Sequence, residues 1–137
     1  MSRVLLVEDE ADLRRLYRVR LEQIGYDIVT VGSAARALEA LAREAIDVVV
    51  LDLGLPDYGG LQLLDEIVSR QPFLPVIIHT GYELWGEDFR SWGAAAYVVK
   101  SPDLSALKKA LAQFAPCAPS WREPAPRTRA GSAVMAV

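Results

Sequence analysis

One stretch restricts the possible folds of this chain more than any other. Residues 46–51 end in Val48-Val49-Val50-Leu51, and Asp52, Gly54 and Pro56 follow at once. Consecutive apolar residues, most of them β-branched, predict a strand buried on both faces, as in the centre of a parallel sheet covered by helices. Ligands of such sheets bind just beyond the carboxyl ends of the strands. We therefore expect Asp52 to lie at the mouth of a binding crevice.

Apolar runs and helix-like patterns alternate along the rest of the chain. Short apolar runs predict four more strands, over 3–7, 28–31, 75–79 and 94–99. Apolar residues at helical spacing predict helices over 13–24, 34–45, 61–68 and 104–114, and more weakly over 82–92. This alternation favours βαβ units with right-handed crossovers. The expected fold class is α/β, a single-domain five-stranded parallel sheet with helices on both faces and, by analogy with flavodoxin-like sheets, the order 2-1-3-4-5.

Length and composition narrow the class of protein. The 137 residues suffice for one domain with a real core, and 52% of them are hydrophobic. The sequence contains no apolar run long enough for a bilayer and no signal pattern, so we expect a cytoplasmic protein. The formal charge of -3 argues against nucleic-acid binding by this chain. Composition changes near Pro116, so the expected organisation is a domain over 1–115 and a disordered tail over 116–137.

Polar residues follow four of the predicted strands. Glu8 and Asp9 follow the first strand, Asp52 the third, Thr80 the fourth and Lys100 the fifth. Parallel strands end at one edge of the sheet, so these side chains should converge. Neighbouring carboxylates repel one another, and oxygen ligands suit Mg²⁺. An aspartate can act as a covalent nucleophile toward phosphorus, while a hydroxyl and an ammonium hold the transferred group.

These residues lie in four motifs that occur in order along the chain: Val4-Leu5-Leu6-Val7-Glu8-Asp9, Leu51-Asp52-Leu53-Gly54-Leu55-Pro56, His79-Thr80-Gly81 and Tyr97-Val98-Val99-Lys100. Each motif alone is weak, but the ordered set is specific. Over residues 3–114 the chain resembles the CheY-like receiver domains of two-component response regulators.

The resemblance implies a function and a set of site residues. Asp52 would be the phosphoacceptor, with Thr80 and Lys100 binding the phosphoryl group. The implied metal is Mg²⁺, or Mn²⁺ in its place, held by Asp9, by Asp52, by the carbonyl of Gly54, and by Glu8 nearby or through water. Thr80 and Tyr97 would form the switch.

The resemblance also implies partners. The donor would be a phosphohistidine on a sensor histidine kinase or a phosphotransfer protein. The phosphorylated domain would act on an unidentified downstream protein and could form a homodimer. It would catalyse only its own phosphorylation and dephosphorylation.

Departures from the family pattern occur near the lysine and the phosphoacceptor. The family usually has proline directly after the lysine, often with a cis bond, whereas Ser101 here precedes Pro102. A cis bond before Ser101 would cost about 3 kcal/mol more than trans, so we expect this loop to be held differently. Gly54 and Tyr82 stand at positions that influence water access in the family, which predicts an unusual phosphate lifetime.

Other functions fit the sequence less well. A phosphatase of the haloacid-dehalogenase type needs a second aspartate where Gly54 stands, and a nucleotide-binding loop would need glycines where the chain has acids. A pseudo-receiver that binds partners without phosphorylation stays open as the alternative. His79 is expected to be an ordinary strand residue, Trp85 and Trp92 to be packing or partner-facing groups, and Cys117 to be inert.

Overall fold

The computed structural model describes residues 2–55, 59–81, 89 and 92–116. Five parallel strands form one sheet in the order β2-β1-β3-β4-β5. The strands are β1 (Arg3–Val7), β2 (Asp27–Val31), β3 (Val48–Leu51), β4 (Val76–Thr80) and β5 (Ala96–Val99). The helices within these described ranges are α1 (Ala11–Gln23), α2 (Ala34–Arg43), α3 (Gly60–Arg70) and α4 (Ser105–Phe114). The predicted fold class and strand order are confirmed.

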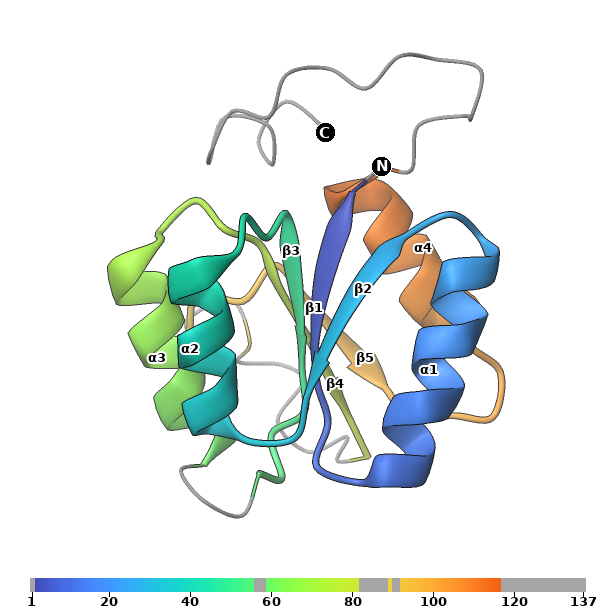
Figure 1. Ribbon diagram of the computed structural model, residues 1–137, viewed down its shortest axis with the longest axis horizontal. Helices are drawn as coiled ribbons and strands as arrows, with labels where there is room; N and C mark the ends of the chain where they lie inside the picture. Colours follow the sequence, from blue (N-terminus) through green and yellow to red (C-terminus); the bar gives the residue numbers. More distant parts are fainter. Residues whose placement is uncertain (1, 56–58, 82–88, 90–91, 117–137) are drawn as a thin grey trace.

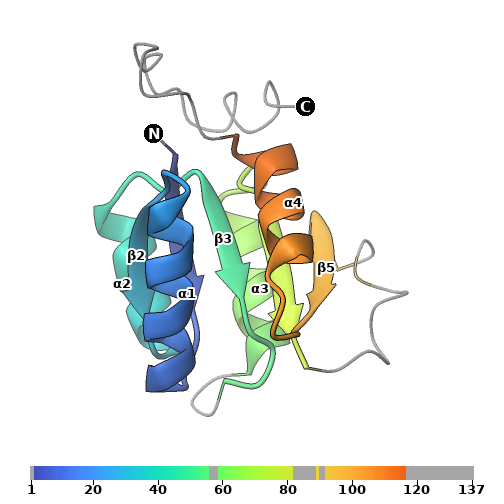
Figure 2. The same ribbon diagram turned by 90° about the vertical axis from the view of Figure 1, so that its right-hand side faces the viewer.

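The helices cover both faces of the sheet. Helices α2 and α3 lie on one face and α1 and α4 on the other (Figure 1). Figure 2 shows α1 and α4 side by side in front of the sheet. Successive residues of β1 point to opposite faces, so Val4 and Leu6 join the core beneath α1 and α4, whereas Leu5 and Val7 join the core beneath α2 and α3. None of the helices in the described ranges combines the length and apolarity needed to cross a bilayer.

Local interactions explain several helix ends. The Ser33 hydroxyl accepts a hydrogen bond from the Arg36 backbone N–H at 3.2 Å and caps α2, as predicted. Gly25, with a φ of 104°, follows α1 and donates its N–H to Glu22 O. Asp103 Oδ1 accepts from the Ser105 N–H at 2.9 Å, so the predicted capping residue acts from two positions before the helix.

Five strand boundaries differ from the predicted ones. The strands predicted over 46–51 and 94–99 begin later, at Val48 and Ala96. The later start of β5 has a physical reason, because the Ala94 N–H donates to Phe89 O and closes a turn before the strand. Strand β4 is shifted by one residue and runs from Val76 to Thr80, and β2 begins one residue earlier than predicted, at Asp27.

The helix predicted over 82–92 lies mostly outside the described residues, as do Trp85, Cys117 and the tail from 117 onward. Of that predicted helix the structure describes Phe89 and Trp92, and both pack against the core beneath α2 and α3. For Trp92 this agrees with the predicted packing role.

The loop between β3 and α3 passes very close to the start of α3. The Gly60 N–H donates to Leu53 O at 3.2 Å. A Cβ placed on Gly60 would lie 2.3 Å from Leu53 Cα and 2.8 Å from Asp52 O. Only glycine allows this approach, which holds the carbonyl of Asp52 and the backbone of Leu53 against the start of α3.

Candidate functional site

Backbone hydrogen bonds hold the predicted site residues at one edge of the sheet. The Glu8 N–H donates to Val31 O and the Asp52 N–H donates to Val7 O, both at 3.1 Å. The Lys100 N–H donates to Thr80 O at 2.7 Å. Each bond continues a strand pairing by one residue, so these side chains emerge together where the strands end.

Lys100 joins the two buried carboxylates of the site. Its Nζ lies 2.7 Å from Glu8 Oε1 and 2.9 Å from Asp52 Oδ2. Glu8 is 2% exposed and Asp52 is 8% exposed. The Gly54 N–H donates to the other Asp52 oxygen, Oδ1, at 3.0 Å. Sequence reasoning brought these residues to one edge but did not pair Lys100 with Glu8.

Burial and charge shift the pKa values of Glu8 and Lys100. Burial raises the pKa of Glu8 above its ordinary value, against the opposing effect of the bonded Lys100 ammonium, and the charge of Asp52 adds to the rise. Burial would by itself lower the pKa of Lys100. Hydrogen bonds to Asp52 and Glu8, and the negative charges of both, outweigh it and raise that pKa. Lys100 is therefore a firmly charged ammonium within the site.

The acidic side chains suit a divalent cation. Glu8, Asp9 and Asp52 each offer a carboxylate oxygen, and these oxygens lie within 4.8 Å of one another. When all three are ionised, the single positive charge of Lys100 leaves a negative excess among them. Asp9 is exposed while the other two are buried, so a hydrated ion could enter from the Asp9 side. This donor set of oxygens alone matches the preference of Mg²⁺.

Thr80 carries a polar atom that has no partner in the described part of the chain. The residue is fully buried, and its Oγ1 has no hydrogen-bond partner among the described residues. Leaving a buried hydroxyl unpaired costs about 1–3 kcal/mol. An acceptor oxygen arriving at this edge of the sheet would remove that cost.

Tyr97 lies diagonally across from Thr80 on the neighbouring strand. It pairs with Ile78 in the register of β4 and β5, and Thr80 follows Ile78 by two residues, so both side chains leave the same face. Tyr97 is half-buried, and its ring centroid lies 6.2 Å from that of Phe89.

The loop after Lys100 is held by its own side chains. The Ser101 hydroxyl donates to Asp103 O at 2.7 Å, and the Asp103 carboxylate accepts from both the backbone and the hydroxyl of Ser105. None of the described peptide bonds is cis.

Sequence reasoning missed Arg14. This side chain of α1 donates from Nη1 to Glu8 O at 2.7 Å and, more weakly, to Asp9 O at 3.4 Å. It therefore holds the backbone of the loop that bears the acidic pair. The available signal was an arginine in the first helical turn after an acidic loop. The spacing of this arginine from the apolar residues of the helix is also typical of a solvent-exposed face.

His79 lies in the core next to the site. It is 2% exposed, and its ring packs edge-on against Tyr17 with 5.1 Å between centroids. Burial, aided by the positive charge of Lys100, lowers its pKa to about 4. The side chain is therefore neutral near pH 7 and occupies a strand position, in agreement with the predicted role.

We expect the His79 pKa to make stability depend on acidity. His79 takes up a proton near pH 6.5 in the unfolded chain but only near pH 4 in the folded chain. The free energy of unfolding should therefore fall as the pH is lowered from 6.5 to 4. The loss from His79 is at most about 3 kcal/mol. Urea denaturation of His79→Phe at pH 7 and pH 4.5 should show a smaller loss than the parent. Tyr17→Phe, which keeps the histidine, is the control, and equal losses in His79→Phe and the parent would contradict the expectation.

Comparison with known proteins gives the same family from sequence. The response regulator receiver domain model matches residues 4–112. The transcriptional regulatory protein GlrR of Escherichia coli (strain K12) is 36% identical over 129 residues, which are 89% of this chain and 29% of that protein. The response regulator protein FleR of Pseudomonas aeruginosa is 40% identical over 116 residues, which are 83% of this chain and 24% of that protein. The chain thus spans less than a third of the length of these two relatives.

Solved structures similar to this chain belong to the same family. The response regulator TrrA of Thermotoga maritima, in complex with Mg²⁺-BeF, has a TM-score of 0.75 and 35% identity, covering 80% of this chain and 95% of TrrA. The structure of TrrA in complex with the histidine kinase ThkA gives a TM-score of 0.74 and 35% identity, covering 80% of this chain and 94% of the matched chain. Because the family model matches residues 4–112, most of its length, this chain belongs to the response regulator receiver domains of two-component systems.

Proposed function

We propose that Asp52 accepts a phosphoryl group from a phosphohistidine and that the modified domain presents an altered surface to a partner. The observation that carries this proposal is the surroundings of Asp52. Its carboxylate is bonded to the Lys100 ammonium, lies beside two further carboxylates, and shares the sheet edge with a threonine hydroxyl unpartnered among the described residues.

The transfer uses groups already in place. A carboxylate oxygen of Asp52 attacks phosphorus, and the bond between phosphorus and the imidazole nitrogen breaks. The bonding pair stays on that nitrogen, and Asp52 becomes an acyl phosphate. Lys100, which already contacts Asp52 Oδ2, neutralises one phosphoryl oxygen, and the Thr80 hydroxyl donates to another.

The acidic residues would hold the metal ion. Asp9, Asp52 and the carbonyl of Gly54 would bind Mg²⁺ or Mn²⁺, with Glu8 beside them or acting through water. When bound, the ion offsets the negative charge that gathers during transfer. The complex of TrrA with Mg²⁺-BeF supports this assignment.

Thr80 and Tyr97 would convert the modification into a change of surface. Thr80 moves toward the phosphoryl group when its hydroxyl donates, and the space it leaves lies on the face that Tyr97 shares. Tyr97 then turns inward, which alters the surface of β5. The equilibrium between the two arrangements would be shifted by the phosphoryl group.

The donor would be a sensor histidine kinase or a phosphotransfer protein. The complex of TrrA with ThkA supports a kinase as the partner. A groove of about 280 Å³ beside Lys100, lined by apolar residues that include Leu13, Leu16 and Pro102, would receive a helix of that donor. We expect this exchange, and therefore this domain, to be cytoplasmic. The downstream step would be a protein contact or a homodimer of the modified form.

Intact-protein mass spectrometry after incubation with acetyl phosphate and Mg²⁺ tests the proposal. We expect one phosphoryl adduct on the full chain and none on Asp52→Asn or in the presence of a chelator. Circular dichroism should show that the variant is folded. A folded parent chain without an adduct, even with its kinase, would favour the pseudo-receiver instead.

A further inference from the structure

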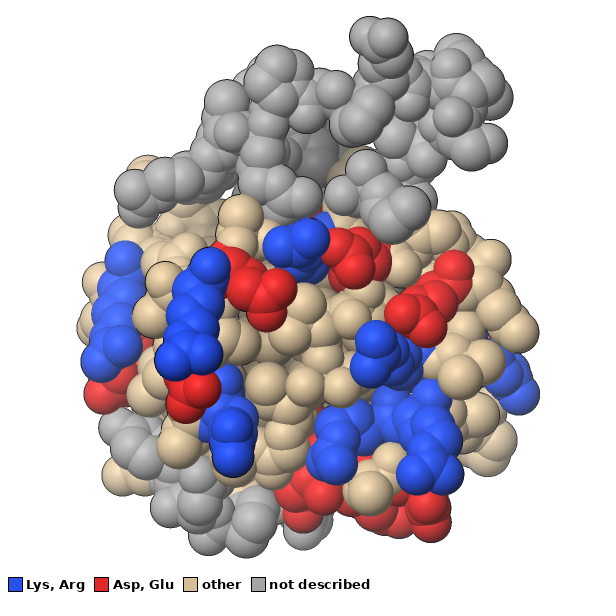
Figure 3. All heavy atoms as spheres, in the orientation of Figure 1, with Lys and Arg blue, Asp and Glu red and all other residues tan. Residues whose placement is uncertain are grey.

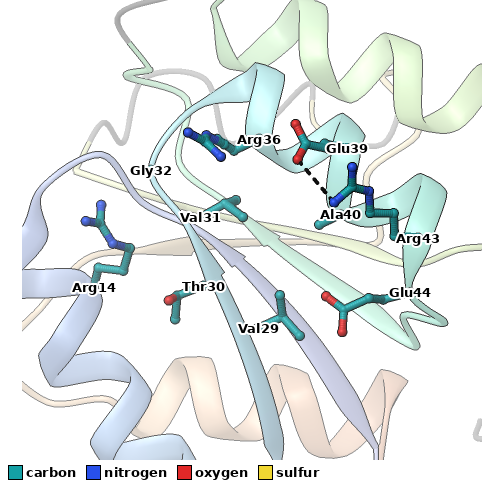
Figure 4. Close-up of a pocket in the computed structure, with 10 residues that line it drawn as sticks. All are labelled: Arg14, Val29, Thr30, Val31, Gly32, Arg36, Glu39, Ala40, Arg43 and Glu44. Carbon is teal, nitrogen blue, oxygen red and sulfur yellow. Dashed lines mark ion pairs between the residues drawn. The ribbon is translucent and has the colours of Figure 1, made fainter.

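A second groove lies along the edge of the sheet, and the proposed phosphotransfer makes no use of it. It measures about 570 Å³ and is formed by β2, the outer face of α2 and the start of α1 (Figure 4). Its lining includes Thr30, Val31 and Gly32 from the strand side and Arg14, Arg36 and Arg43 from the helices.

The backbone of β2 offers hydrogen-bonding groups to this groove. β2 is an edge strand and pairs with β1. Val31 O accepts from the Glu8 N–H, so the odd-numbered residues of β2 direct their backbone groups toward β1. Backbone groups alternate along a strand. The N–H and C=O of Thr30 and the N–H of Gly32 therefore point away from β1, where an added extended segment could pair with them.

Charges around the groove are unevenly compensated. Glu39 pairs with Arg43 at 3.7 Å, and Glu44 pairs with Arg3 at 3.6 Å. Within the described ranges, by contrast, no carboxylate forms an ion pair with Arg14 or Arg36. The acidic residues of the lining are thus already paired. Arg36 has no anionic partner in the described part of the chain, and Arg14, whose Nη1 donates to backbone carbonyls, keeps its other N–H donors for an incoming anion.

These two arginines lie at the same end of the groove. Figure 4 shows Arg14 from α1 and Arg36 from α2 on opposite sides of Gly32. A Cβ on Gly32 would lie 2.8 Å from Arg14 Nη1, so the glycine leaves the space that this guanidinium fills. Figure 3 shows basic side chains on both sides of the path of β2. The groove thus combines an open strand edge with two cations at one end.

We propose that this groove binds an acidic extended segment of a partner protein, which adds as a strand beside β2 and places carboxylates against Arg14 and Arg36. Main-chain pairing with the strand edge supplies affinity, and the two guanidinium groups select acidic side chains. Arg14 also donates to Glu8 O, so the occupied groove contacts the loop of the acidic pair. The inference does not depend on phosphorylation of Asp52.

Nuclear magnetic resonance of the ¹⁵N-labelled full chain tests the proposal. The probe is a synthetic eight-residue peptide in which aspartate alternates with valine. We expect shifts of the Thr30 and Gly32 amides and of the Arg14 and Arg36 side-chain Nε–H groups. A peptide with lysine in place of aspartate should not bind. The acidic peptide should also fail to bind when N-methylation removes its alternate backbone N–H donors.

Two arginine variants on one helix provide the matched comparison. Arg36→Ala should weaken binding about tenfold, because a hydrogen bond to a charged group is lost. Arg43→Ala combined with Glu39→Gln removes from α2 an arginine together with the carboxylate paired with it, and should change binding less than twofold. Equal weakening by both variants would overturn the proposal, as would binding of the N-methylated peptide. So would an oligonucleotide that occupies the groove more tightly than the peptide. The unfolding temperatures of both variants should match that of the parent.

Discussion

Gly60→Ala should lower the free energy of unfolding by about 3 kcal/mol, the upper end of the usual cost of overpacking. The added Cβ would lie 2.3 Å from Leu53 Cα and 2.8 Å from Asp52 O. Both atoms belong to the backbone, so relief requires the loop after β3 to move. That loop carries the Gly54 N–H that donates to Asp52. We therefore expect the rate of phosphoryl transfer to fall together with the free energy of unfolding.

The sign of this effect separates it from ordinary helix propensity. Alanine in place of a helical glycine normally stabilises a helix by about 0.5–1 kcal/mol. Urea denaturation of Gly60→Ala should show the opposite sign. Gly81→Ala serves as the control, because a Cβ on Gly81 meets nothing within 4 Å among the described residues. A Gly60→Ala protein as stable as the parent would show that the two segments can separate at little cost.

Lys100→Met should lower the free energy of unfolding by about 3 kcal/mol at pH 8, because removing one partner of a buried ion pair leaves the other charges uncompensated. Lys100 has only 19% of its side chain exposed and bonds to both Glu8 and Asp52. Methionine has a similar length, so the effect reports charge more than packing.

The loss should shrink as the solution is acidified. Without Lys100, only the hydrogen bond from the Glu10 N–H opposes burial and the charge of Asp52, and the pKa of Glu8 rises further above the ordinary value of 4.5. The folded variant then binds a proton that the unfolded chain does not hold until about pH 4.5. Its stability relative to the parent should therefore improve as pH falls through this window.

Denaturation at pH 8 and pH 5 provides the measurement. Lys109→Met removes a charge from the exposed side of α4 and should change stability little at either pH. Adding Glu8→Gln to Lys100→Met should recover part of the loss at pH 8. A loss that is the same at both pH values would show that Glu8 is not the group left uncompensated.

Much of the fold and of the candidate site could be predicted from sequence. The apolar runs ended at Glu8, Asp52, Thr80 and Lys100, and a parallel topology places the ends of all strands at one edge. Burial on both faces explains why β3 reads as a continuous apolar run, and helical spacing marked the helices that cover it. Strand boundaries were predicted less well, because the terminal residues of a strand depend on hydrogen bonds that the apolar pattern does not show, as where the Ala94 N–H donates to Phe89 O before β5.

Local sequence patterns were enough to predict the sheet, its covering helices and the residue types at its carboxyl edge, because apolar periodicity and turn residues are local properties. Three features became visible only in the folded chain: Lys100 bonds to Glu8 as well as to Asp52, Thr80 Oγ1 has no partner among the described residues, and the Arg14 guanidinium lies against Gly32. These contacts join segments distant in sequence. Their distances depend on how the helices pack and on which side-chain rotamers fit, and no local pattern encodes that.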